Sequence, residues 1–413
     1  MLHLFIFLLA LIPTITAQSY SPDTILALRV RNSSSCDVGI LNCAVPVHLE
    51  EIITTTGQVL STTLIASPNA YALSSLDKMT GALERCGDGN CVTFSVLSGV
   101  TPGSSLSGAR SVFVRVTDRR LISSFPITSA LTTYTSVCSS GWLESTNTWS
   151  EFIAVDGVSS TLTAYDNIAS SSTPFSDGVL QLTSCSAPNP TRYVIAKYDG
   201  TSASVAYVNS ITATSFQTPG SFPSNILKFK QILVSHEITV ASRAWALDLN
   251  FLATFTVDEI TSLGNFVTFS SIRTRTARSI GLPSGSTMTG IALSLDEQSL
   301  FITTQSGIYS LSTSNQTAVA ILVRSVTIGF EYRGVAIAPL RCSPGAPGHY
   351  CDATTKLLPC KPGTSSFTAG GSTCTACPVG KIAPNYGMSD CTDCPIGKLM
   401  CLLFFSSFLS FFS

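Results

Sequence analysis

Short apolar runs separated by small polar residues make up most of this chain. The clearest are TILALRV (24–30), SVFVRV (111–116), RYVIAKYD (192–199) and SLFITT (299–304). Runs rich in β-branched and aromatic residues, bounded by Gly, Ser, Asp or Asn, are typical of β-strands joined by turns. The nearest approach to a helical pattern, ALSSLDKMTGALERC (72–86), is interrupted by Gly81, so we interpret it as straddling a turn. The pattern predicts an all-β domain over residues 18–341.

Internal repetition favours a β-propeller for this domain. GIALSLDEQSLFITTQSGIYSLS (290–312) reads as three strands separated by an acidic turn and a glycine turn, and GVAIAPL begins again at Gly334. WALDLNFLATFTVDEITSL (245–263) offers a similar opening at a comparable interval before Gly290. Intervals of about 40–50 residues match a four-stranded blade, so we expect about seven blades, or six. A pair of large β-sandwiches is the alternative.

Cysteines in this domain bracket predicted turns. GALERCGDGNCVTFSV reads as a strand, a turn at Asp88-Gly89 and a second strand. Three disulfides are expected: Cys86 with Cys91 across that turn, Cys36 with Cys43 around DVGILN, and Cys138 with Cys185 by exclusion, joining neighbouring blades or strands.

The N-terminal segment MLHLFIFLLALIPTITA has the pattern of a secretory signal peptide. Its apolar run from Leu4 to Ile12 is far shorter than the roughly 20 residues that a membrane-spanning helix needs. Small polar residues follow Pro13, and we expect cleavage after Ala17. A buried N-terminal strand is the alternative, but a polar, Ser/Thr-rich domain follows at once. The sequence therefore predicts residues 1–17 as a signal peptide and an extracellular location.

The low charge of the chain argues against nucleic acid as a partner. Only 11% of residues are charged and the net charge is −1, so the chain lacks the overall positive charge that nucleic-acid binding requires. Its 14 cysteines, in a secreted chain, should be mostly oxidised to disulfides.

The C-terminal stretch CTACPVGKIAPNYGMSDCTDCPIGK contains two C-x-x-C pairs at nearly the spacing of a zinc ribbon. However, Cys360, Cys377 and Cys394 recur every 17 residues, each opening a C-x-x-G phrase, and Cys374 and Cys391 repeat at the same interval. This tandem repeat favours the disulfides Cys360–Cys374 and Cys377–Cys391 over a metal site. Each would close a loop of about 15 residues and stabilise the fold by about 3 kcal/mol. No metal or other cofactor is expected.

Residues 342–398 resemble the ephrin-receptor-like (GCC2/GCC3) cysteine-rich repeats, which are similar in style to EGF and TNF-receptor modules. The resemblance is carried by GHYCD around Cys351, the GTSSFTAGGSTC loop and the repeated C-x-x-C-P-x-G motif. It implies a rod-like spacer or contact module of an extracellular protein, without catalytic residues. Cys342 with Cys351 is the remaining local pair.

The last residues, 399–413, break the repeat. Cys374 and Cys391 are 17 residues apart, so the next cysteine of this series, the expected partner of Cys394, would be at position 408, where the chain has Phe408. From Leu402 onward the tail contains only Phe, Leu and Ser. All three can be encoded by pyrimidines alone, so we interpret the tail as translated intron sequence that cuts the third repeat. A short membrane anchor is the alternative, although the tail is below spanning length and lacks the polar spacer of a GPI signal. If the tail is genuine, Cys394 would pair with Cys401 or another chain; otherwise membrane attachment would use a segment missing from this chain.

Catalytic signatures are absent from the sequence. Three histidines follow the signal segment: His48, His236 and His349. SHEITVAS begins like a zinc-protease HExxH motif, but Val240 replaces the second histidine, so we interpret His236 as an ordinary strand residue. A metal-dependent, lactonase-like propeller hydrolase is the alternative function, with Asp248 and Asn250 as candidate ligands. Asp at a strand end is more often a turn former.

Two N-x-[ST] sequons, at Asn32 and Asn315, lie in predicted turns and are candidate N-glycosylation sites. Together these features predict a secreted or cell-surface glycoprotein without catalytic activity. Its propeller would bind an extracellular protein or glycan, and its disulfide-repeat stalk would act as a spacer.

Overall fold

In a computed structural model of the chain, the residues that can be described are 19–32, 36, 40, 42–67, 69–126, 134–139, 141–143, 148–149, 152–155, 161–165, 170–174, 181–189, 192–198, 203–208, 229–235, 242–260, 266–342, 346–351, 356–368 and 370–394. The expected signal peptide and C-terminal tail lie outside them. The described part contains β-strands and one 3-10 helix, η3 (Arg278–Ile280). No helix in these ranges is long and apolar enough to cross a membrane.

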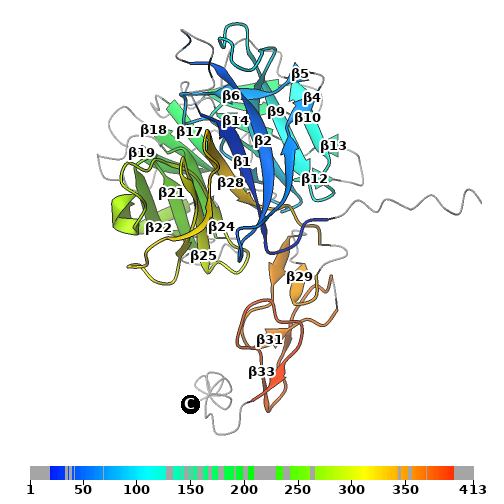
Figure 1. Ribbon diagram of the computed structural model, residues 1–413. Helices are drawn as coiled ribbons and strands as arrows, with labels where there is room; N and C mark the ends of the chain where they lie inside the picture. Colours follow the sequence, from blue (N-terminus) through cyan, green and yellow to red (C-terminus); the bar gives the residue numbers. More distant parts are fainter. Residues whose placement is uncertain are drawn as a thin grey trace, which may run out of the picture.

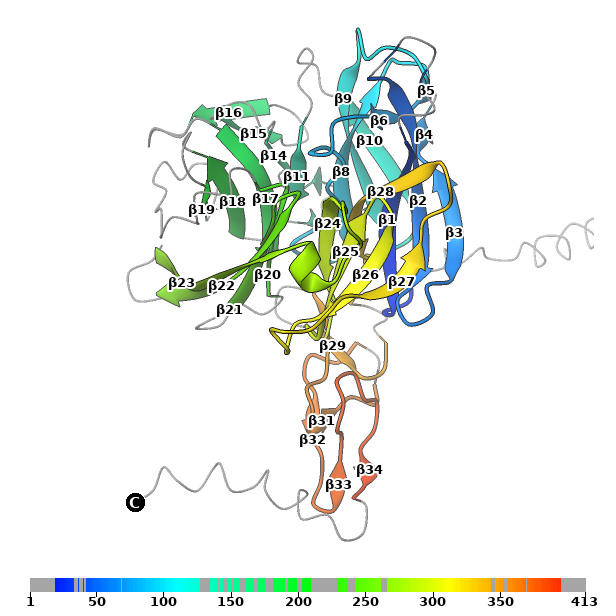
Figure 2. The same cartoon turned by 60° about the vertical axis from the view of Figure 1, so that its left-hand side comes forward.

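Antiparallel strands form six blades around a common centre (Figures 1 and 2). Listed from the inner to the outer strand, blade I contains β28 (Phe330–Ile337), β1 (Thr24–Arg31), β2 (Ala44–Ile53) and β3 (Val59–Leu64), and blade II contains β7 (Glu84–Arg85), β8 (Cys91–Ser98), β9 (Arg110–Thr117) and β10 (Ile122–Pro126). Blade III contains β11 (Ser136–Ser139), β14 (Phe152–Val155), β15 (Thr161–Tyr165) and β16 (Ser170–Pro174), and blade IV contains β17 (Gln181–Asn189), β18 (Arg192–Tyr198) and β19 (Ala203–Val208). Blade V contains β20 (Gln231–Val234), β21 (Ser242–Leu247), β22 (Phe251–Ile260) and β23 (Phe266–Thr276), and blade VI contains β24 (Met288–Leu293), β25 (Ser299–Thr304), β26 (Gly307–Ser312) and β27 (Ile321–Ser325). Adjacent inner strands contact one another in a closed ring. The described strands therefore make a six-bladed β-propeller, with the lower of the two expected blade numbers.

Blade I is built from both ends of the domain. Its inner strand β28 pairs antiparallel with β1, in a register that runs from Ile25 opposite Ile337 to Arg31 opposite Phe330. A short strand, β6 (Ala72–Ser74), lies between β2 and β8 and joins blades I and II into one continuous sheet. Minor hairpins are formed by β4 (Ala66–Ser67) with β5 (Asn69–Ala70) and by β12 (Trp142–Leu143) with β13 (Thr148–Trp149).

Two glycines allow the inner strands to approach closely. A Cβ atom on Gly290 of β24 would lie 2.7 Å from the Cα atom of Gly334 of β28. A Cβ atom on Gly334 would lie 2.2 Å from the carbonyl oxygen of Gly81. Because no side chain fits at either position, the repeated glycine that marks these strands in the sequence has a steric cause.

One of the three segments expected to begin alike starts at a different strand of its blade. Residues 290–312 form β24, β25 and β26, and GVAIAPL lies in and just after β28, so both begin with the inner strand of a blade. The segment that begins at Trp245 instead starts within β21, the second strand of blade V. Its apolar opening resembles an inner strand because Trp245 and Leu247 are buried against blade VI.

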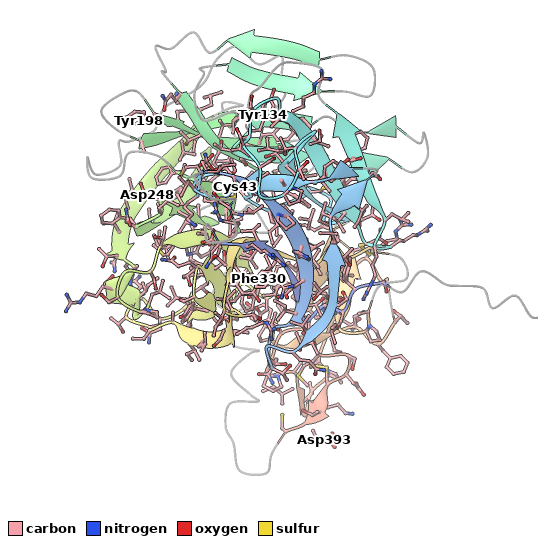
Figure 3. The ribbon with its side chains drawn as sticks, turned by 45° about the horizontal axis from the view of Figure 1, so that its top comes forward. Cys43, Tyr134, Tyr198, Asp248, Phe330 and Asp393 are labelled. Carbon is pink, nitrogen blue, oxygen red and sulfur yellow. A yellow bond between two sulfur atoms is a disulfide. The ribbon has the colours of Figure 1, made fainter. Side chains whose placement is uncertain are left out.

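A narrow stalk of small hairpins extends from one face of the propeller (Figures 1 and 2). Its strands are β29 (His349–Cys351), β30 (Leu357–Pro359), β31 (Thr364–Ser365), β32 (Thr375–Ala376), β33 (Lys381–Ile382) and β34 (Thr392–Asp393). Figure 3 shows Asp393 at its distal end. The base of the stalk is continuous with the propeller core, because Cys342 and Leu357 belong to the largest buried apolar cluster.

Candidate functional site: the propeller channel and a lateral arginine groove

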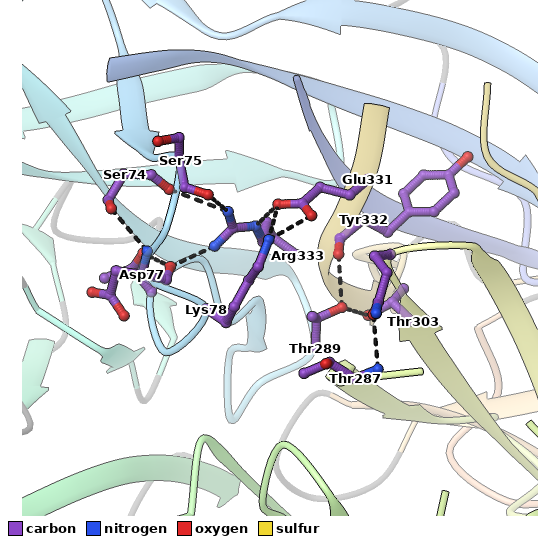
Figure 4. Close-up of polar contacts among 12 residues, drawn as sticks. Ser74, Ser75, Asp77, Lys78, Thr287, Thr289, Thr303, Glu331, Tyr332 and Arg333 are labelled. Atoms are coloured by element: carbon purple, nitrogen blue, oxygen red, sulfur yellow. Dashed lines mark hydrogen bonds and ion pairs between the residues drawn. The ribbon is translucent and has the colours of Figure 1, made fainter. Parts of the chain in front are cut away.

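Charged side chains gather beside the inner strand β28 (Figure 4). Arg333 of β28 is fully buried, and its Nε donates to Glu331 Oε1 at 2.5 Å. Its Nη2 donates to the carbonyl oxygen of Ser75 at 2.8 Å. Lys78 Nζ lies 2.5 Å from Glu331 Oε2. Burial is the main reason that the pKa values of Lys78 and Arg333 are lowered, and the charge of Arg333 lowers the pKa of Lys78 further.

Lys230, just before β20, is held by neutral groups in the same region. Its Nζ donates to the carbonyl oxygens of Lys78 at 2.5 Å, Arg333 at 2.8 Å and Thr80 at 3.1 Å. Burial, followed by repulsion from Arg333, lowers the pKa of Lys230 well below its ordinary value. These bonds tie the inner strands to the segment between β6 and β7, so we assign this cluster a structural role.

Glu84 of β7 is a buried acid near the middle of the channel. Burial raises its pKa well above the ordinary glutamate value, although hydrogen bonds with Gln231 and Ser136 oppose the shift. Its Oε1 has no hydrogen-bond partner among the described residues. Burial therefore favours the neutral, protonated form of this side chain in the folded protein.

One end of the central channel is closed by the stalk. A cavity of only about 40 Å³ remains between the inner strands, lined by Glu84 and Arg85 and by Lys356 from the stalk. Lys356 is 3% exposed and Leu357 is 2% exposed. Within the described residues, this cavity has room for a few water molecules and is too small for a larger ligand.

The two candidate ligands of a propeller hydrolase form a hairpin turn between β21 and β22. Asp248 Oδ1 accepts a hydrogen bond from the backbone N–H of Asn250 at 3.1 Å, and the Asp248 N–H donates to the carbonyl oxygen of Phe251 at 2.9 Å. Asn250 is exposed. These contacts are those of a turn former, and neither residue lines the channel cavity. The third singled-out residue, His236, lies outside the described residues.

A groove of about 730 Å³ is lined by residues of blades V and VI. Figure 2 shows the strands of these two blades, β20–β23 and β24–β27. Strand pairing places Trp245, Thr254 and Arg273 in one row across blade V. Arg275 and Arg243 occupy the adjoining rows. We call this site the arginine groove, defined by Arg243, Arg273 and Arg275 together with the facing residues Thr313, Asn315 and Gln316 of blade VI.

Neutral acceptors hold the three arginines of this groove. Arg243 Nη1 donates to the Thr313 carbonyl oxygen at 3.0 Å, and its guanidinium lies 5.7 Å from the centroid of the Trp245 ring. Arg275 Nη2 donates to the Ala318 carbonyl oxygen at 2.6 Å, and Arg273 donates to Gln316 Oε1. Among the described residues, none of the three has a carboxylate partner, and no Asp or Glu lines the groove.

Composition gave no sign of this groove, because a net charge of −1 averages over the whole chain. The local signal is the alternation in SIRTRTAR (271–278), which puts Arg273 and Arg275 on one face of a strand. Arg243 lies thirty residues earlier, and only the pairing of β21, β22 and β23 brings it to the same face.

Six disulfides lie within the described residues, and they have the pairs expected from the sequence. They join Cys36 to Cys43, Cys86 to Cys91, Cys138 to Cys185, Cys342 to Cys351, Cys360 to Cys374, and Cys377 to Cys391. The third links β11 to β17, the inner strands of blades III and IV. Cys394 is also disulfide-bonded, to a partner outside the described residues. Cys401 lies outside them too.

The two sequon asparagines are both on turns. Asn32 follows β1, is half-buried, and donates its backbone N–H to the Gly329 carbonyl oxygen at 3.0 Å. Asn315 is exposed, between β26 and β27, and its Oδ1 accepts a hydrogen bond from Thr317 Oγ1 at 2.8 Å.

The fold and its appended stalk define a disulfide-bonded β-propeller protein. No protein-family model and no curated protein matches the sequence. Similar solved structures include the crystal structure of a nidogen/laminin complex (8% identity, 76% of this chain and 98% of that chain, TM-score 0.46). Others are the Cps50 (Swd1) β-propeller domain of Myceliophteria thermophila (9%, 78% and 92%, 0.43) and apo AztD from Citrobacter koseri (8%, 76% and 98%, 0.38).

Proposed function

We propose that this chain is an extracellular recognition protein, in which the propeller binds a macromolecular partner and the stalk acts as a spacer. The signal-like N-terminus and the disulfide-rich composition support an extracellular location. The observation that carries the recognition role is the open arginine groove on a propeller whose central channel is closed. We further propose that Asn32 and Asn315 carry N-glycans. Because Asn315 also lines the arginine groove, a glycan on this residue and a ligand in the groove would exclude each other.

The stalk base supports the spacer role because it is fixed to the propeller. Cys342 and Leu357 belong to the buried core cluster of the propeller, and Lys356 is 3% exposed. A docked base and successive disulfide-closed hairpins would hold the propeller in a defined orientation, whereas a flexible linker would not.

Binding of the full chain to cell-derived extracellular matrix tests the proposal. We expect saturable binding that is unchanged in a stalk variant, Phe367→Ser with Val379→Ser, because these side chains are 81% and 82% exposed and belong to the spacer. Absence of saturable binding would overturn the recognition role. Binding that disappears in the stalk variant would instead make the stalk the contact surface, contrary to the proposal.

A further inference from the structure

We propose that the arginine groove binds a sulfated polysaccharide. This inference rests on the proposed recognition function and narrows the partner to one chemical class. It follows from the uncompensated charge of the groove, the positioning of its guanidinium groups, their spacing, and the chemistry of the surrounding side chains.

The charge of the groove differs from that of other arginines in the propeller. Several other buried and half-buried arginines pair with carboxylates: Arg29 with Glu50, Arg120 with Glu51, Arg333 with Glu331, and Arg341 with Asp118. Arg243, Arg273 and Arg275 share a concave surface with no described carboxylate. In a chain with almost no net charge, this groove is a local concentration of positive charge that favours an anionic ligand.

The guanidinium groups are positioned before any ligand binds. Backbone carbonyl oxygens fix Arg243 and Arg275, and the Gln316 side chain fixes Arg273. Neutral acceptors orient a guanidinium without neutralising it, and each arginine has five N–H donors. Less side-chain entropy is therefore lost when an anion binds.

The spacing of the arginines indicates a ligand with several charges. Arg273 and Arg275 are two residues apart on one face of β23, a separation of roughly 7 Å along the strand. Arg243 lies two strands away, roughly 10 Å across the sheet. Backbone positions this far apart suit anionic groups repeated along a chain, such as the sulfates of a polysaccharide.

The rest of the lining favours a sugar over an acidic peptide. Hydroxyl and amide groups from Thr254, Thr274, Ser312 and Gln316 border the arginines and can hydrogen-bond with sugar hydroxyls. The apolar floor is covered: Trp245 is only 3% exposed, and other floor residues are equally buried. Peptide recognition usually depends on an apolar or aromatic anchor in a pocket, and this groove exposes no such pocket.

Heparin serves as the probe for the experiment. We expect the full chain, produced without N-glycans so that Asn315 in the groove is unmodified, to bind immobilised heparin. The affinity should fall as salt rises, because exposed charges are screened over about 8 Å at physiological ionic strength. Arg273→Gln should weaken binding about fivefold, and Arg243→Gln with Arg273→Gln should weaken it further. Arg110→Gln, which removes an exposed arginine of blade II, is the matched control and should bind like the wild type.

Several outcomes would overturn the inference. Equal losses in the Arg110 and Arg273 variants would show non-specific attraction. Competition by polyglutamate as effective as by heparin, or undiminished competition by desulfated heparin, would show that the groove does not recognise sulfated sugars. Absence of heparin binding would have the same meaning.

The two proposals can fail separately. If the Arg273 variant binds matrix normally and heparin does not compete, the recognition function stands and the groove inference falls. If heparin binding depends on Arg273 but the chain does not bind matrix, the groove inference stands and the proposed recognition of a matrix partner falls.

Discussion

At the scale of single residues, the inner surface of the propeller combines buried charges with neutral hydrogen-bond acceptors. Lys230 is bound by three carbonyl oxygens, whereas Glu84 has a carboxyl oxygen with no described partner. Burial favours the neutral form of such an acid in the folded state, whereas in the unfolded state it ionises as an ordinary glutamate. Stability should therefore depend on pH through this residue.

Glu84→Gln tests that dependence. Below the ordinary glutamate pKa, Glu84 is neutral in both states and its ionisation has no effect on stability. Above it, the unfolded state loses a proton that the folded state keeps, so wild-type stability falls with rising pH, by up to about 1.4 kcal/mol per unit. We expect the stability advantage of Glu84→Gln to grow from pH 4 to pH 7, measured by urea unfolding. A difference that does not change with pH would contradict a raised pKa.

The exposed sequon at Asn315 gives a second prediction at this scale. In protein from a eukaryotic secretory host, an endoglycosidase that removes N-glycans should increase electrophoretic mobility. Thr317→Ala should lose the Asn315 contribution, because the sequon is destroyed. Thr317→Ser, which keeps the sequon and a hydroxyl that can donate to Asn315, should retain it. Equal glycan content in the two variants would exclude modification at Asn315.

At the scale of elements, the hairpins follow from local sequence, but their assembly does not. Residues 290–312 alternate apolar runs with turn residues, so three strands of blade VI are predictable. The short disulfide loops are predictable for the same reason, since their partners are close in the chain. The arginine groove depends on the register of the hairpins β21–β22 and β22–β23, which shifts between Thr254 and Thr256, and on the packing of blade V against blade VI. A single sequence does not give that register or that packing.

The stalk base is another element that sequence pattern did not reveal. Repeats suggested a boundary at residue 342, yet Lys356 and Leu357 are buried against the propeller. A lysine gives no sequence signal of burial, because its type is usually exposed. The boundary between propeller and stalk is therefore a packed interface.

Leu357→Ala measures how strongly that interface stabilises the protein. Removing a buried leucine side chain should lower the free energy of unfolding by about 2–4 kcal/mol, through lost burial and the cavity left behind. Val379→Ala is the control: its side chain is 82% exposed, so the change should stay within about 0.5 kcal/mol. Equal small effects in thermal or denaturant unfolding would mean that the stalk base does not stabilise the propeller.

At the scale of the whole molecule, ring closure depends on one strand. β28, the inner strand of blade I, pairs with β1 of the same blade. It also contacts β24 of blade VI on one side and β7 of blade II on the other, so it closes the ring between these two blades. Its loss would leave β1 as an open sheet edge and remove the buried cluster around Arg333.

A chain truncated after Ser325 should therefore fail to reach the native fold. We expect it to aggregate or to be digested rapidly by protease, without a cooperative unfolding transition. A control chain ending after Ala376 keeps β28, the docked stalk base and the Cys360–Cys374 disulfide, and should unfold cooperatively. Cooperative unfolding of the shorter chain would show that the ring closes without β28.

The pairing of β1 with β28 also sets an order of events during biosynthesis. About 300 residues separate these strands, so at about 5–20 residues per second β1 waits about 15–60 s for its partner to be synthesised. Throughout that interval its backbone edge is available to any other extended chain. The Cys36–Cys43 and Cys86–Cys91 loops span few residues and can form early, but they do not cover that edge. Until the last blade is made, correct folding therefore requires that no other extended chain pairs with this edge.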